Sequence, residues 1–281
     1  MPYHGCVEAA FFDLDKTVIS KSSSLALSRP MYRAGLVSRS ALLRGAYAQL
    51  VYLLVGADEK KMDRVKESML ALTKGWDQSH VEQIIHEALT ELIDPYIYLE
   101  AIDLMELHRA LGRKVFIVSS SPEEVVRALA ERLGAVDVIA TRAKIADGLY
   151  TGELDFYCYG EGKADAIREL AQAEDIDLTA SYAYSDSMTD LPMLEAVGHP
   201  VAVNPDHALR KEAERRGWQV RYFRRPVRLR QRLPQVSAPS PLVTVAVATG
   251  AVAAVVGWVY LRRMTGGRGR SAAWRSASRS D

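Results

Sequence analysis

Two aspartates spaced two apart, Asp13 and Asp15, follow a short apolar run in the stretch FFDLDKTVIS at residues 11–20. Carboxylates this close repel each other and disturb each other's pKa, an arrangement that a purely structural segment seldom needs. The pair therefore indicates either a solvated turn or a site in which a cation or a reacting group lies between the two carboxylates. The second alternative predicts chemistry at the end of a buried strand.

Three further polar clusters occur along the chain. Ser119 and Ser120 follow the apolar run VFIV, Lys163 opens the stretch GKADAIRELAQAE, and Asp186 and Asp190 stand in YSDSMTDLPML. A site built from all these clusters holds four carboxylates, which require a hard divalent cation with oxygen ligands. Mg²⁺ is the natural choice, especially where a phosphate group supplies further ligands.

The segments that carry these clusters alternate between strand and helix patterns. We predict strands over 7–15, 113–121, 136–143, 181–187 and 199–204, and helices over 24–95, 122–134, 162–174 and 189–198. Such alternation predicts an α/β fold with a parallel sheet that helices cover on both faces. Ligands of these sheets bind beyond the carboxyl ends of the strands, which is where the polar clusters fall.

Composition and cysteine content indicate a globular protein of a reducing compartment. The chain has 281 residues, of which 48% are hydrophobic and 25% charged, and a formal net charge of +1. Its two cysteines, Cys6 and Cys158, are far apart and form no disulfide framework. We expect no nucleic-acid partner.

The C-terminal part has a different character. Residues 242–261, LVTVAVATGAVAAVVGWVYL, carry no charge and end with Trp258 and Tyr260. A helix of this length spans roughly 30 Å, which is the thickness of the hydrocarbon core of a bilayer. Trp and Tyr are enriched at the interface between membrane and water, where the end of such a helix lies. We predict one transmembrane helix, with a buried helix of a soluble domain as the alternative. Residues 226–241 read as a basic, proline-containing linker, and 262–281 as a disordered Arg-rich tail.

Taken in order, DLDKT, the serine after VFIV, Lys163 and SDSMTD resemble the four motifs of haloacid dehalogenase (HAD) phosphatases, over about residues 7–225. The helical insert after the first strand resembles the small cap of the phosphoserine-phosphatase-like subclass. The resemblance implies a Rossmann-like core at 1–20 and 96–225 with an all-helical cap at 21–95.

The resemblance also implies roles in catalysis. Asp13 would be the nucleophile that forms an aspartyl-phosphate, and Asp15 would protonate the leaving group and then activate water. Ser119, with Ser120 as the competing choice, would hold the phosphoryl oxygens together with Lys163. The implied Mg²⁺ ligands and their supporting residue are Asp13, Asp15 through its carbonyl, Asp186 and Asp190.

The substrate is less clearly indicated. Phosphoserine phosphatases usually carry a glutamate shortly after the first motif, whereas VISKSSSLALS at 18–28 has no acidic residue. Arg64 either corresponds to a cap arginine that binds a substrate carboxylate or is an ordinary exposed helix residue. The apolar stretch at 41–56 is either cap core or a surface that touches lipid.

These features give three hypotheses. The first is an Mg²⁺-dependent phosphomonoester hydrolase acting on a small or membrane-associated ester, such as a lysophospholipid or glycerophosphate. The second is a phosphoserine phosphatase, and the third is a membrane-tethered binding protein with an inactive HAD fold. We expect a single-pass membrane protein that contacts lipid through 242–261, with the catalytic domain on the cytoplasmic side.

Overall fold

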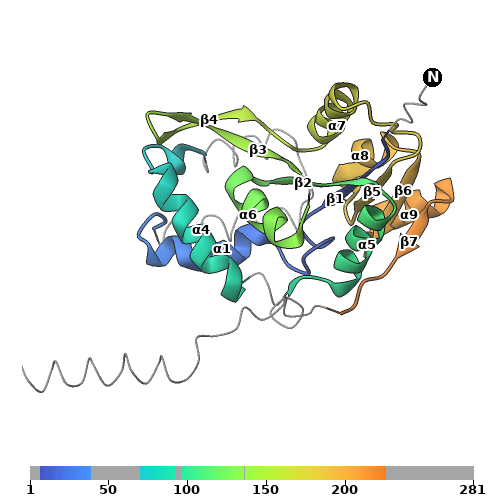
Figure 1. Cartoon of the computed structure of the whole chain (residues 1–281). Helices are drawn as coiled ribbons and strands as arrows, with labels where there is room; N and C mark the ends of the chain where they lie inside the picture. Colours follow the sequence, from blue (N-terminus) through green and yellow to red (C-terminus); the bar gives the residue numbers. More distant parts are fainter. Residues whose placement is uncertain (1–6, 39–69, 93–95, 136, 226–281) are drawn as a thin grey trace, which may run out of the picture. The chain divides into compact units, whose positions relative to one another are not determined.

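A sheet with strand order β4–β3–β2–β1–β5–β6–β7 forms the centre of the computed structural model, which describes residues 7–38, 70–92, 96–135 and 137–225 (Figure 1). The strands of these residues are β1 (Ala9–Asp13), β2 (Lys114–Pro122), β3 (Asp137–Ala146), β4 (Leu149–Phe156), β5 (Tyr182–Ser185), β6 (His199–Val203) and β7 (Gln219–Arg221). All neighbouring strands pair in parallel except β3 and β4, which form an antiparallel hairpin. The described residues all belong to one unit, Met1–Gln231.

The register of the central strands brings the ends of three of them together. Asp13, the last residue of β1, pairs with Val118 of β2, and Phe12 pairs with Tyr184 of β5. All five residues of β1 are buried, because helices cover both faces of this strand. The segments that follow β1, β2 and β5 therefore leave the sheet side by side, as a ligand site at this edge requires.

Helices pack on both faces of the sheet. The described helices are α1 (Ser23–Arg33), α4 (Gln78–Leu92), α5 (Leu99–Ala110), α6 (Glu123–Leu133), α7 (Glu161–Ala173), the 3-10 turn η2 (Met188–Asp190), α8 (Leu191–Glu195) and α9 (His207–Arg216). Phe12 contributes to a core shared with α1, α4, α5 and α6, whereas Phe11 contributes to a second core shared with α7, α8 and α9. Successive side chains of a strand point to opposite faces, so β1 joins the two cores.

The helix α6 shows how local sequence sets an element's ends. Its N-cap is Pro122, and its C-cap is Gly134 in the left-handed conformation at φ 66°. Glycine adopts this conformation without the steric cost that a Cβ brings. The apolar positions between these ends, among them Val126, Leu129 and Leu133, are buried against the sheet.

The α/β prediction is confirmed, with corrections to single elements. The predicted parallel sheet has one antiparallel strand, β4, because the short DG turn at Asp147 and Gly148, both at positive φ, reverses the chain into a hairpin. The predicted continuous helix at 24–95 is interrupted in the described part, where Gly75 at φ 83° precedes α4. The helices α5 and α9 and the strands β4 and β7 were not predicted.

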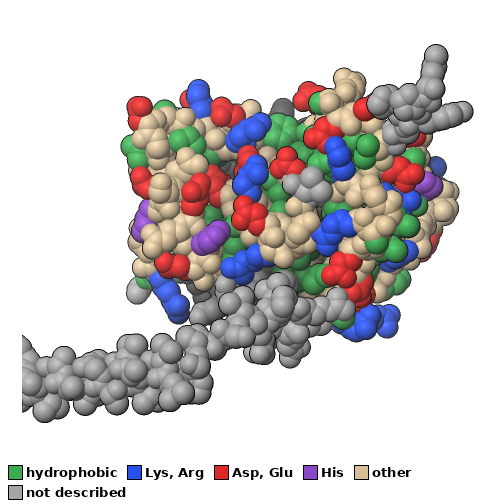
Figure 2. Space-filling model, in the orientation of Figure 1, with side chains coloured by type: hydrophobic (Ala, Val, Ile, Leu, Met, Phe, Trp, Pro, Cys, Tyr) green, Lys and Arg blue, Asp and Glu red, His purple; other side chains and the backbone are tan. Residues whose placement is uncertain are grey.

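Several predicted features lie outside the described residues, among them the linker at 226–241 and the Arg-rich tail at 262–281. No helix of the described ranges is long and apolar enough to cross a membrane. The predicted span at 242–261 lies outside these ranges. Arg64 and the apolar stretch at 41–56 also lie outside the described part of the chain. On the face that Figure 2 shows, acidic and basic side chains are interspersed.

A buried histidine supports the strand that leads to the site. His108 of α5 is 2% exposed, and its Nε2 lies 2.7 Å from the hydroxyl of Tyr184. The ring of Tyr184 stacks on Phe12, with the ring centroids 4.3 Å apart. Burial, which is the largest cause, and the nearby charges of Arg113 and Arg221 together lower the pKa of His108 to about 4. His108 is therefore neutral at pH 7 and packs as part of the core.

This pKa predicts a pH dependence of stability. In the unfolded chain His108 takes up a proton near its ordinary pKa of 6.5, whereas in the folded chain it does so only near 4. The unfolded state thus binds more protons in this interval, and the free energy of unfolding falls as pH is lowered through it. Urea unfolding at several pH values should show a shallower fall for His108→Gln than for wild type. Parallel curves for the two proteins would contradict this role of His108.

Candidate active site

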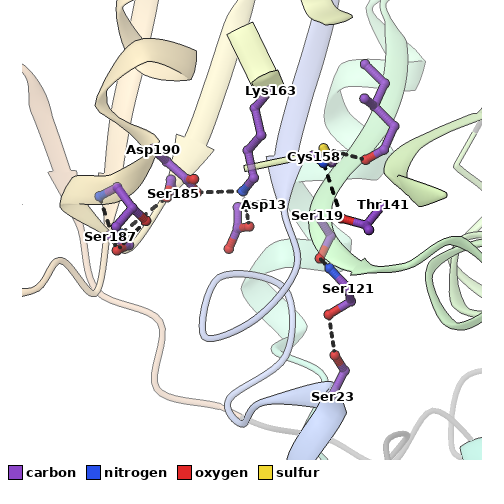
Figure 3. Close-up of polar contacts among 12 residues, drawn as sticks. Asp13, Ser23, Ser119, Ser121, Thr141, Cys158, Lys163, Ser185, Ser187 and Asp190 are labelled. Carbon is purple, nitrogen blue, oxygen red and sulfur yellow. Dashed lines mark hydrogen bonds and ion pairs between the residues drawn. The ribbon is translucent and has the colours of Figure 1, made fainter. Parts of the chain in front are cut away.

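A buried lysine joins two carboxylates at the end of β1. The Nζ of Lys163 donates to Oδ1 of Asp13 at 2.7 Å and to Oδ2 of Asp190 at 2.8 Å (Figure 3). The exposed fractions of these residues are 6% for Asp13, 2% for Lys163 and 3% for Asp190. The structure thus brings together three predicted site residues that lie 150 and 27 positions apart in the sequence.

Close packing at the start of α7 fixes the position of Lys163. A Cβ on Gly162 would lie 2.6 Å from the carbonyl oxygen of Tyr157, so a larger residue would push the first turn of α7 away. Gly160, at φ 54°, turns the chain into this helix from the buried Cys158. The glycines of YGEGK therefore let α7 begin close enough to β1 for the lysine to reach Asp13.

The loop after β5 carries the other carboxylates. Ser185 is buried, and its hydroxyl donates to Oδ2 of Asp190 at 2.7 Å, so this oxygen accepts from both a hydroxyl and the lysine. Ser187 caps η2 by accepting from the backbone N–H of Thr189. Asp186 is buried, and one of its oxygens lies 3.9 Å from Nζ of Lys16.

The second aspartate of the first motif lies against the start of α1. One oxygen of Asp15 accepts the backbone N–H of Ser23 at 2.9 Å, and the other accepts the hydroxyl of Ser22 at 3.4 Å. The N-terminus of a helix has unsatisfied N–H groups and a favourable dipole for a carboxylate. Asp15 is therefore oriented by the segment through which the chain enters the predicted cap.

The serines after β2 differ in their surroundings. Ser119 is buried and its hydroxyl accepts the backbone N–H of Ser121, whereas Ser120 is exposed. The hydroxyl of Ser121 lies 2.8 Å from that of Ser23 (Figure 3). A chain of hydrogen bonds thus runs from Ser119 through Ser121 and Ser23 to Asp15.

Burial dominates the electrostatics of the site. It raises the pKa of Asp13 well above its ordinary value against the opposing effect of Lys163, and it raises the pKa of Asp186 to about 7. Burial by itself lowers the pKa of Lys163, but the two carboxylates more than offset this effect and hold the ammonium charged. Together with Asp190, three buried carboxylates face one buried ammonium, so the site has an excess of negative charge that a bound cation would relieve.

The donor set fits Mg²⁺ in its chemistry. The side chains of Asp13 and Asp186 are oxygen donors, and each is held in a buried position where a cation would stabilise its charged form. Oδ2 of Asp190 already accepts hydrogen bonds from Lys163 and Ser185, so this residue is better suited to support the metal ligands than to bind the metal itself. Within the described ranges, no three His, Cys, Asp or Glu side chains converge into a ready-made metal cage. Any metal shell here would thus rely on backbone, water or substrate oxygens as well.

Two contributors to the site were missed in the sequence. Ser23 binds Asp15 through its backbone N–H, an interaction that depends on where α1 begins and that no side-chain pattern reveals. Ser185 was not named as a site residue, although its hydroxyl holds Asp190. Its place at the end of β5, one residue before Asp186, was the available signal.

Comparisons with known proteins agree with this geometry. Residues 10–195 match the family model of haloacid dehalogenase-like hydrolases. A probable phosphatase of Mycobacterium tuberculosis is 53% identical over 256 residues, covering 91% of this chain and 89% of that protein. A phosphoserine phosphatase of the same organism is 34% identical over 249 residues, covering 88% and 79%. A crystal structure of a Bordetella pertussis protein of unknown function is similar at a TM-score of 0.69 and 29% identity, covering 77% of this chain and 98% of that one.

The chain therefore belongs to the haloacid dehalogenase-like hydrolase family, because the family model spans more than half of it and the relatives match along most of their length. Within that family it is an enzyme of the phosphatase class. The resemblance stated from the four motifs is thereby confirmed.

The buried triad of Asp13, Lys163 and Asp190 predicts a large and pH-dependent loss of stability when the lysine is replaced. Lys163→Met leaves Asp13 and Asp190 facing each other in a buried site, which should lower the free energy of unfolding at pH 7 by roughly 3–5 kcal/mol. The loss should shrink as pH is lowered from 7, because Asp13, whose pKa burial raises, then takes up a proton. Urea unfolding over a series of pH values measures the effect.

Arg168 of the same helix provides the matched control. It pairs with Glu161 and Asp165 on the exposed side of α7, where removing an ion pair costs less than about 1 kcal/mol. Equal losses for Lys163→Met and Arg168→Met would show that the buried triad contributes no more than a surface pair.

Proposed function

We propose that this chain is an Mg²⁺-dependent phosphomonoester hydrolase that works through an aspartyl-phosphate on Asp13. The observation that carries the proposal is the ammonium of Lys163 held between Asp13 and Asp190 at the buried end of β1. A carboxylate fixed in this way has its Oδ1 bound to the lysine, which leaves Oδ2 as the attacking oxygen. The same ammonium offers positive charge to the phosphoryl group that arrives there.

In the first step Oδ2 of Asp13 attacks phosphorus, and the bond from phosphorus to the ester oxygen breaks. The leaving oxygen takes a proton from Asp15. In the second step Asp15 accepts a proton from a water molecule as that water attacks phosphorus, and the bond to Asp13 breaks to release inorganic phosphate. Burial raises the pKa of Asp15, although the N–H of Ser23 opposes this, and a raised pKa favours the protonated form that the first step needs.

The remaining site residues support these steps. Ser119 follows Val118, the β2 partner of Asp13, so its hydroxyl would bind the phosphoryl oxygens, whereas the exposed side chain of Ser120 is the weaker candidate. Asp13, Asp186 and the carbonyl of Asp15 would hold Mg²⁺, with Asp190 as its support through Lys163. When bound, the cation supplies positive charge that offsets the excess of carboxylates and the charge on phosphate.

For the substrate we propose a small or membrane-associated phosphate ester. Phosphoserine is the second candidate, because a relative with 34% identity is named a phosphoserine phosphatase. Against it, the serines that follow the first motif bind Asp15, and no acidic side chain is present there to bind a substrate amine. The intact contact between Asp13 and Lys163 argues against a binding protein that has lost turnover.

The domain boundaries remain part of the proposal. We assign residues 1–20 and 96–225 to the catalytic core and 21–95 to a helical cap, of which α1 and α4 are described. These two helices pack on each other, and α4 also contacts α6 of the core. Arg64 would contribute substrate recognition from the cap. The sequence supports 226–241 as a linker and 262–281 as a basic tail.

The catalytic roles predict sharp losses of turnover. Wild type with Mg²⁺ should release phosphate from a generic aryl phosphate, and Asp13→Asn should abolish the release because an amide is no nucleophile. Asp15→Asn should reduce kcat by roughly 10²–10⁴-fold, the usual contribution of a general acid. Phosphate release with and without Mg²⁺ measures both effects.

Asp177→Asn is the control, because Asp177 is a partly exposed aspartate whose side chain, among the described residues, accepts hydrogen bonds only within its own turn, from Thr179 and Ala180. It should keep wild-type turnover. Wild type that hydrolyses no phosphate ester in the presence of Mg²⁺, or Asp13→Asn that turns over as wild type does, would end the proposal.

We further propose that residues 242–261 anchor the enzyme in the membrane as a single span, with the catalytic domain on the cytoplasmic side and with lipid contacts through the anchor. Two charges in the apolar run, Ala248→Arg and Val252→Arg, each cost about 2.5–3.5 kcal/mol at the centre of a bilayer. The double variant should move from the membrane pellet to the supernatant after cell lysis and alkaline extraction. Ala273→Arg in the tail is the control, and a wild type that is itself extracted would contradict the anchor.

A further inference from the structure

An exposed aspartate outside the four motifs holds the loop that carries Asp186. Asp206 is the N-cap of α9, and its Oδ1 accepts the backbone N–H of Leu209 at 2.8 Å. Its Oδ2 accepts the backbone N–H of Met188 at 3.0 Å, and its own N–H donates to the carbonyl oxygen of Asp186 at 2.8 Å. Both carboxylate oxygens and the backbone of Asp206 are thus engaged.

These contacts restrict the loop on both sides of Ser187. The carbonyl of Asp186 and the N–H of Met188 are both bound to Asp206, so the turn that aims the side chain of Asp186 is fixed against the end of α9. The helix α9 in turn packs on β6 and β7 through the buried Leu209 and Ala213. Asp206 therefore connects a rigid part of the core to the carboxylate.

We propose that Asp206 is a positioning residue for Mg²⁺, which orients Asp186 through the backbone of the loop at Asp186 and Met188. The inference rests on the proposed function, since it takes Asp186 as a metal ligand. It extends that function to a residue that touches neither the substrate nor the reacting atoms.

Asp77 offers a matched comparison within the chain. It too is an exposed aspartate that precedes a helix, and its Oδ1 accepts the backbone N–H of His80 at 2.8 Å, as Oδ1 of Asp206 does from Leu209. Asp77 lies at the start of α4, away from the loop after β5. The two positions therefore share the helix cap and differ in the contact with Met188.

The test is direct Mg²⁺ binding by isothermal titration calorimetry on the full chain. Asp206→Asn retains one acceptor for two N–H groups, and Asp206→Ser retains a good cap oxygen without any second acceptor. Both variants should bind Mg²⁺ roughly 10-fold more weakly than wild type, as loss of a residue that supports a metal ligand usually does. Asp77→Asn should bind as wild type does.

Melting temperatures without Mg²⁺ separate this role from a purely structural one. Asp206→Ser and Asp77→Asn should both stay folded, and only the former should lose affinity for the metal. Wild-type affinity in both Asp206 variants would overturn the inference, and so would a wild type that binds no Mg²⁺. If the wild type binds Mg²⁺ and the Asp206 variants bind it more weakly, but no phosphate ester is hydrolysed, the inference stands and the proposed reaction fails.

Discussion

The ammonium of Lys163, buried between Asp13 and Asp190, is the interaction on which the site depends. A charge in this position is stable only where its partners are fixed, because desolvation costs several kcal/mol for each ion. The sheet supplies one partner from the end of β1, and the loop after β5 supplies the other. The hydroxyl of Ser185 completes the arrangement by donating to Asp190. The excess of carboxylates that remains is the physical reason to expect a divalent cation.

The fold makes this arrangement possible because the carboxyl ends of β1, β2 and β5 meet at one edge of the sheet. The strand β1 lies between β2 and β5, so residues from distant parts of the sequence leave the sheet at the same edge. Helix termini then complete the site: the start of α1 binds Asp15, the start of α7 supplies Lys163, and the start of α9 holds the loop with Asp186. Each of these contacts is made by backbone groups or by a residue of the first turn, where N–H groups are unsatisfied.

The sequence predicted the core of this architecture because hydrophobic periodicity and motif order are local signals. The alternation of strands and helices, and the four polar clusters at strand ends, could be read directly. The β3–β4 hairpin was not predicted, although the DG turn at Asp147 and Gly148 is a local signal for a hairpin. Only the place of β4 at the edge of the sheet depends on the other strands. The contacts of Ser23 and Asp206 also escaped prediction, because backbone N–H groups and helix starts leave little trace in residue types.

The most direct test of the central claim is to trap the phosphoryl group on the enzyme. Wild type mixed with Mg²⁺ and an excess of aryl phosphate is quenched in acid within the first turnovers, and peptides are mapped by mass spectrometry. The account predicts a phosphoryl group on the peptide that contains Asp13, sensitive to hydroxylamine as an acyl phosphate is, and absent from Asp13→Asn. Hydrolysis that proceeds without any such adduct, or an adduct on another residue, would contradict the nucleophilic role of Asp13.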